Sequence, residues 1–147
     1  MKAQRGFTLV EILIVVVILG ILAAIVIPQF TEASTEAKLS SLCSDLQTVR
    51  SQIELYKVQH NDNMPGVVSG VTFIQALTMT TDLNGALATT GEIYGPYLQS
   101  MPKNPFNDLN TVEVETDNAG LGGGNMGWHF ATGTGDFRAD DTAHDTY

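Results

Sequence analysis

The sequence contains a single cysteine, Cys43, among its 147 residues. One chain therefore cannot form an internal disulfide bond. Cys43 falls among apolar positions of a predicted helix, and no neighbouring residue in the sequence would activate it as a nucleophile. We therefore expect a buried structural thiol.

Basic residues are also scarce. Seven Lys and Arg stand against sixteen Asp and Glu, which gives a formal net charge of −9. A chain this acidic lacks the basic patch that nucleic-acid binding requires, so we expect no nucleic-acid partner. A solvated acidic surface accounts for the excess of carboxylates.

Motifs that carry catalytic chemistry are missing as well. His60, His129 and His144 are scattered without metal-ligand spacing. The glycine-rich stretch 120–124 is not followed by the Lys-Ser/Thr pair of a phosphate-binding loop. No persuasive Ser/His/Asp order is present. We therefore expect a structural protein rather than an enzyme.

The longest apolar run lies near the N-terminus. Residues 12–27 carry no polar side chain, and a helix over residues 7–27 would be roughly 31 Å long, enough to cross a bilayer. Lys2 and Arg5 precede the run, so the positive-inside rule places the N-terminus in the cytoplasm and the remainder across the membrane. No small-residue cleavage site closes the run, so it is not a secretory signal peptide and we expect it to be retained.

Glu11 is the one carboxylate beside this apolar run. A charged side chain in a membrane span costs about 2.5 to 3.5 kcal/mol at the centre and less near the end. The cost implies a partner for the carboxylate. Alternatively, Glu11 lies at the interface, where the positive end of the helix dipole makes it tolerable.

Residues 2–11, with the sequence KAQRGFTLVE directly before the apolar run, resemble the prepilin-type signal of type IV pilins and type II secretion pseudopilins. The resemblance implies that a membrane-embedded prepilin peptidase cleaves between Gly6 and Phe7 and methylates the new N-terminus at Phe7. It also implies that Glu11 neutralises the N-terminal amine of a neighbouring subunit in a homopolymer. Two charges that are each costly in hydrocarbon would offset one another there.

These features divide the chain into a leader (1–6), a transmembrane and polymerisation half-helix (7–30) and a periplasmic or extracellular domain (31–147). Pro28 ends the apolar run and removes a helical hydrogen bond, so we expect a kink or local melting. The resemblance implies that this segment unwinds on assembly. Alternatively, Pro28 only marks the exit from the membrane.

Beyond Pro28, apolar residues recur in steps of three and four, which is helical spacing with one apolar stripe. Asn61 and Pro65-Gly66 end the pattern. A helix over residues 7–60 would be roughly 80 Å long, too long for so small a domain, so half of it should project. The stripe comprises Leu39, Leu42, Leu46, Val49, Ile53 and Tyr56.

The C-terminal half predicts little regular structure. Residues 71–80 are a candidate short helix, and residues 111–115 alternate as a strand does. Residues 127–131 and 135–139 read as a hairpin across Thr132-Gly133-Thr134. The expected fold class is α+β, a long helix packed on a small antiparallel sheet. This resembles the type IV pilin fold, especially that of the compact major pseudopilin.

Asp136, Asp140 and Asp141 belong to an acidic C-terminal cluster. Carboxylate oxygens are ligands that calcium prefers, although the spacing does not fit an EF-hand. Major pseudopilins carry a calcium site in a C-terminal loop rich in Asp and Gly, and the resemblance implies such a site here, on an imperfect and shortened pattern. The alternative is a solvated acidic tail.

The single cysteine cannot build the C-terminal disulfide loop of many classical type IV pilins. The resemblance therefore favours the major pseudopilin of a type II secretion system. Its implied partners are the inner-membrane assembly platform and minor pseudopilins, and its implied role is the export of folded proteins from the periplasm. Two alternatives are a surface type IV pilus subunit for adhesion, motility or DNA uptake, and a single-span anchored binding protein or enzyme.

Overall fold

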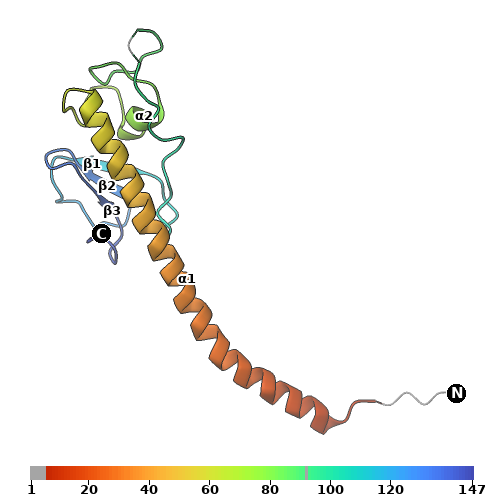
Figure 1. Ribbon diagram of the computed structural model, residues 1–147. Helices are drawn as coiled ribbons and strands as arrows, with labels where there is room; N and C mark the ends of the chain where they lie inside the picture. Colours follow the sequence, from red (N-terminus) through yellow and green to blue (C-terminus); the bar gives the residue numbers. More distant parts are fainter. Residues whose placement is uncertain (1–5, 92) are drawn as a thin grey trace. The chain divides into compact units, whose positions relative to one another are not determined.

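The computed structural model describes residues 6–91 and 93–147. The elements, in chain order, are α1 (Leu9–Gln59), α2 (Phe73–Thr78), β1 (Val112–Glu115), β2 (Trp128–Ala131) and β3 (Asp136–Ala139) (Figure 1). The chain forms two compact units, Met1–Ala37 and Lys38–Tyr147. A long apolar helix and a small sheet confirm the expected α+β class of the type IV pilin fold.

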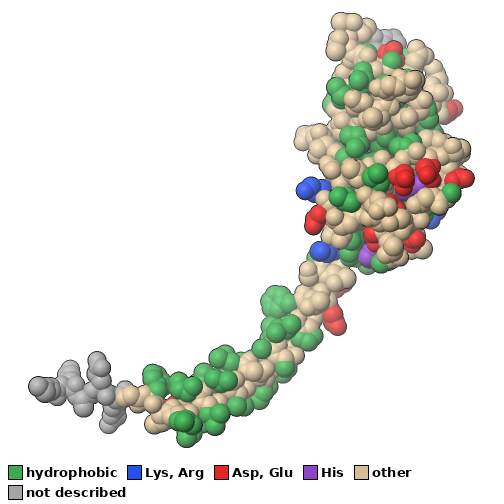
Figure 2. All heavy atoms as spheres, turned by 180° about the vertical axis from the view of Figure 1, so that it is seen from behind, with side chains coloured by type: hydrophobic (Ala, Val, Ile, Leu, Met, Phe, Trp, Pro, Cys, Tyr) green, Lys and Arg blue, Asp and Glu red, His purple; other side chains and the backbone are tan. Residues whose placement is uncertain are grey.

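The first unit contains the N-terminal part of α1 and, before it, the described residues 6–8. All of its described residues, 6–37, are exposed, and large apolar side chains follow one another along the helix (Figure 2). The most apolar 18-residue window of α1 has a mean hydropathy of 3.3, so by length and composition this helix can cross a membrane. Pro28 lies inside α1. Its predicted kink stays a prediction.

The second unit has its core between the C-terminal part of α1 and the sheet. The apolar stripe of α1 is buried from Leu42 to Tyr56, whereas Leu39 at its start is only half-buried. The stripe packs with aromatic side chains of the sheet and of α2, among them Trp128, Phe130 and Phe73. The predicted stripe is therefore confirmed, because helical spacing directs these residues to one face.

The prediction that Cys43 is buried is wrong. Its side chain is exposed, although Leu42 beside it is fully buried. Successive helical residues point about 100° apart, because 3.6 residues make a turn. One step along the helix therefore carries Cys43 off the buried stripe.

The sheet has the order β1-β2-β3. β2 and β3 are antiparallel, with Phe130 opposite Phe137, which confirms the predicted hairpin. The expectation of an antiparallel sheet is wrong for β1, which runs parallel to β2 with Glu113 opposite His129. The long connection 116–127 allows this, because parallel neighbours need a crossover instead of a tight turn.

The predicted helix at residues 71–80 is present but shorter, as α2. Thr72 caps it by accepting a hydrogen bond from Gln75 N at 3.2 Å, and the Gln75 side chain accepts one from Thr72 N at 2.9 Å. This reciprocal capping box satisfies two backbone donors at the start of the helix. Phe73, Ala76 and Leu77 of α2 then enter the core.

Candidate functional site

The predicted processing site lies just before α1. Gly6 and Phe7 precede the helix and are exposed, Phe7 to 85%. A side chain placed on Gly6 would meet nothing within 4 Å. The peptide bond between them is therefore accessible and non-helical. Residues 1–5 of the predicted leader (1–6), with Lys2 and Arg5, lie outside the described residues.

Glu11 forms hydrogen bonds with Thr8, the residue directly before α1. Thr8 N donates a hydrogen bond to Glu11 Oε2 at 2.7 Å, and the Thr8 hydroxyl donates a second to the same oxygen at 2.8 Å. Glu11 N donates in return to Thr8 Oγ1 at 3.2 Å. This is a capping box that closes the first turn of α1. The role of Thr8 was missed from sequence, although the Thr-x-x-Glu spacing is its signal.

The cap leaves one oxygen of the carboxylate available. In the described part of the chain both side-chain bonds fall on Oε2, and Oε1 accepts none. Glu11 can therefore cap the start of the helix through Oε2 and still accept a hydrogen bond through Oε1. An ammonium group from outside the chain is such a donor.

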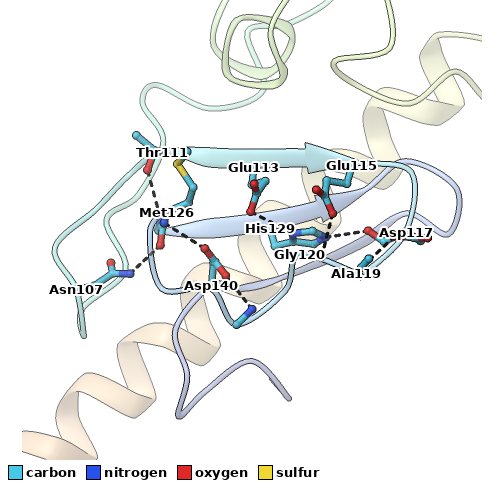
Figure 3. A network of polar contacts seen from close by, with 12 residues as sticks. Asn107, Thr111, Glu113, Glu115, Asp117, Ala119, Gly120, Met126, His129 and Asp140 are labelled. Atoms are coloured by element: carbon cyan, nitrogen blue, oxygen red, sulfur yellow. Dashed lines mark hydrogen bonds and ion pairs between the residues drawn. The ribbon is translucent and has the colours of Figure 1, made fainter.

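Asp140, a predicted calcium ligand, is fully buried and already bonded to backbone. Its Oδ1 accepts a hydrogen bond from Gly122 N at 2.8 Å, and its Oδ2 accepts one from Met126 N at 3.1 Å (Figure 3). The side chain of Asn107 donates to Met126 O at 2.8 Å from the other side. Asp140, which directly follows β3, thus anchors the glycine-rich loop over the sheet.

The other two predicted ligands have different partners. Asp136 accepts hydrogen bonds from Asn118 at 3.1 Å and from Arg138 at 3.2 Å. Asp141 lies 2.6 Å from His144 Nδ1 and accepts a bond from Asn104 at 3.2 Å. Among the residues that the structure describes, no group of three acidic, histidine or cysteine side chains could hold a metal ion. These three carboxylates as they stand do not fit a shared calcium site, and calcium binding stays a prediction.

The bonds of Asp136 make the stability of the domain depend on pH. The hydrogen bond from Asn118 lowers the pKa of Asp136 below its ordinary value of 3.8, with desolvation opposing it and Arg138 adding to it. A lowered pKa contributes stability that is present above the unfolded pKa and is lost as the pH falls through the folded pKa. Asp136 should therefore help stabilise the fold at neutral pH and lose this effect below about pH 4.

We expect Asn118→Ala to raise the pKa of Asp136 toward its ordinary value, because it removes the largest cause of the shift. A carboxyl-carbon NMR titration of the full chain in detergent micelles measures this pKa directly. Asp108→Asn, an exposed change elsewhere, should leave it unchanged. An Asp136 pKa that is equal in the parent and in Asn118→Ala would contradict the assignment.

Comparison with known proteins supplies the context for these sites. Residues 1–27 match the family model described as the prokaryotic N-terminal methylation motif. The match covers Gly6, Phe7 and Glu11. No solved structure matches the chain significantly.

Curated relatives extend the similarity into the second unit. The chain is 33% identical over 106 residues to the type II secretion system core protein G of Klebsiella pneumoniae, covering 72% of this chain and 71% of the relative. It is 32% identical to the protein of the same name from Vibrio cholerae, covering 79% and 81%. A fimbrial protein of Pseudomonas aeruginosa is 44% identical, but over only 37% of this chain and 35% of its own length. The chain therefore belongs to the type IV pilin-like family, as a pseudopilin of the kind named type II secretion system core protein G.

Proposed function

We propose that this protein is the major pseudopilin of a type II secretion system, a structural subunit that polymerises into a filament and has no catalytic role. The observation that carries the proposal is its similarity to core protein G along more than two thirds of the length of two relatives. The fimbrial relative matches over a much smaller share of the chain. A surface pilus subunit is therefore the second candidate.

Processing and insertion follow from the N-terminal segment. The exposed, non-helical Gly6-Phe7 bond suits cleavage by a prepilin peptidase, with methylation of Phe7. Lys2 and Arg5 before the apolar run favour a cytoplasmic N-terminus in the inner membrane and a periplasmic domain. The mature subunit then begins at Phe7, with Thr8 and Glu11 in the first turn of its anchor.

Assembly would use the free oxygen of Glu11. The positive N-terminal amine of one mature subunit would bind Oε1 of Glu11 in its neighbour while Oε2 keeps the cap with Thr8. Each unpaired charge is costly in hydrocarbon, so pairing favours subunits that meet in the correct axial register.

The exposed apolar side chains of the first unit would pass from lipid to contacts with other subunits. Pro28 would let the helix unwind locally on entry. Minor pseudopilins and an inner-membrane platform are the proposed partners.

The proposal is tested by deleting the gene and measuring folded exoproteins in the culture supernatant. We expect them to be lost from the medium and retained in the periplasm, and to return when the gene is supplied on a plasmid. A plasmid copy in which Gly6 is replaced by a residue that blocks leader cleavage should not restore secretion. Unchanged secretion in the deletion strain would reject the proposal, and loss of surface filaments would then favour the pilus subunit.

A further inference from the structure

Among the described residues, no strand lies beside the outer edge of β1. Within the described residues β1 pairs with β2 alone (Figure 1). Thr111 O accepts a hydrogen bond from Trp128 N at 3.0 Å, and Glu115 O accepts one from Thr132 N at 2.8 Å. Because bonding direction alternates along a strand, the backbone N–H and C=O groups of Val112 and Val114 point away from β2. These are the groups that an added strand would bind.

The opposite edge of the sheet, formed by β3, is partly covered by a side chain. β3 is the other outer strand, and Phe137 O accepts a hydrogen bond from Arg50 Nε of α1 at 3.0 Å. A side chain thus covers part of the β3 edge, which is a common protection of sheet edges against unwanted pairing. The described residues give the β1 edge no such covering bond.

An apolar groove runs beside this open edge. Its volume is about 430 Å³, and the side chain of Val114 on its wall is 38% exposed. The N-terminal part of α2 forms the opposite wall, through Phe73 and Ile74. A strand added to β1 would direct every second side chain into this groove. The lining residues are Gly66, Thr72, Phe73, Ile74, Thr111, Val112, Val114 and Met126.

Charge on the other face of β1 restricts what such a strand can be. Glu113 and Glu115 alternate with the two valines and lie on the face that carries His129 (Figure 3). Glu115 Oε2 accepts a hydrogen bond from Gly120 N at 3.0 Å, and Glu113 Oε2 lies 4.0 Å from His129 Nδ1. In the described chain neither carboxylate pairs with Lys or Arg. Opposite charges stabilise cross-strand pairs, and like charges destabilise them.

We propose that the β1 edge and its groove bind an extended segment of a partner protein in which apolar residues alternate with Lys or Arg. The apolar side chains fill the groove, the basic side chains face Glu113 and Glu115, and the backbone pairs with Val112 and Val114. A second copy of β1 is a poor occupant, because it would bring more glutamates to the same edge. This surface is independent of the proposed function.

The probe is a short fluorescent peptide in which lysine alternates with valine, titrated against the full chain in detergent micelles and followed by fluorescence anisotropy. A matched peptide alternates glutamate with valine, and empty micelles correct for partition into detergent. We expect the basic peptide to bind at least about tenfold more tightly than the acidic one. Equal affinities would overturn the proposal.

Val114→Pro tests whether the backbone edge is used. The N–H of residue 114 points away from β2, so proline removes a donor from the open edge without removing a bond within the sheet. We expect affinity for the basic peptide to fall about tenfold or more in this variant, while Val114→Thr, which keeps the N–H, stays within about threefold of the parent. Fluorescence of Trp128, buried in the core, reports that each variant is folded.

Charge reversal tests the specificity. Glu113→Lys with Glu115→Lys should reverse the preference, so that the acidic peptide binds more tightly than the basic one. Glu32→Lys with Glu36→Lys makes the same change in net charge in the first unit and should preserve the original preference. An unchanged preference in the β1 variant would overturn the proposal. Self-association that Val114→Pro abolishes would assign the groove to a second copy instead, and would overturn it as well.

Discussion

Glu11→Ala should leave leader removal intact and reduce the yield of assembled filament by about tenfold or more. The cleavage bond lies outside the capping box, whereas in the proposed filament the variant would leave the amine of a neighbouring subunit without its carboxylate in hydrocarbon. A charged side chain costs about 2.5 to 3.5 kcal/mol at the centre of a membrane-spanning helix and less near its end. The measurement is the ratio of sheared filament to membrane-bound mature subunit on immunoblots.

Glu11→Gln separates the capping box from the proposed charge pairing. Glutamine can still accept from Thr8 and keep the capping box, but it carries no charge. If charge pairing drives assembly, Glu11→Gln should fail as Glu11→Ala does. Thr8→Ala, which weakens the cap and keeps the charge, should retain most of the yield. Normal assembly by Glu11→Gln together with failure of Thr8→Ala would show that only the cap matters.

Asp140→Ala should lower the free energy of unfolding of the second unit by about 3 kcal/mol. The substitution removes two charge-assisted hydrogen bonds and leaves the N–H groups of the half-buried Gly122 and Met126 without their acceptor. Asp140→Asn should be intermediate, because one amide oxygen remains to accept while the amide nitrogen faces a donor. Denaturant unfolding of the full chain in micelles, followed by fluorescence of Trp128, the only tryptophan, provides the measurement.

Asp108→Asn is the matched control for this effect. Asp108 is exposed and adopts a φ of 59°, a conformation that asparagine also accepts. It loses the same charge and should leave the unfolding midpoint close to that of the parent. Equal midpoints for Asp140→Asn and Asp108→Asn would reject the anchoring role. Repeating the experiment with calcium and with a chelator tests the calcium prediction, since a bound ion would stabilise the folded parent.

The sequence predicted the features that depend on local pattern. The apolar run fixed the membrane-compatible part of α1, and spacing of three and four residues identified the buried stripe from Leu42 to Tyr56. The turn residues between β2 and β3 predicted the hairpin. The segment around Gly6, Phe7 and Glu11 pointed to the family that the relatives then showed. Each of these signals lies within a short window of sequence.

Only the tertiary structure decided how distant segments meet. The parallel pairing of β1 with β2 depends on the path of the connection 116–127, which carries no periodic signal. In the sequence, Asp140 does not differ from the other residues of the acidic C-terminal cluster. Only the fold brings the N–H groups of Gly122 and Met126 within hydrogen-bond distance of its carboxylate. The open edge of β1 likewise follows from strand order rather than from its residues. Such contacts are set by burial of backbone donors and acceptors far apart in the chain, which must find partners wherever the fold brings them together.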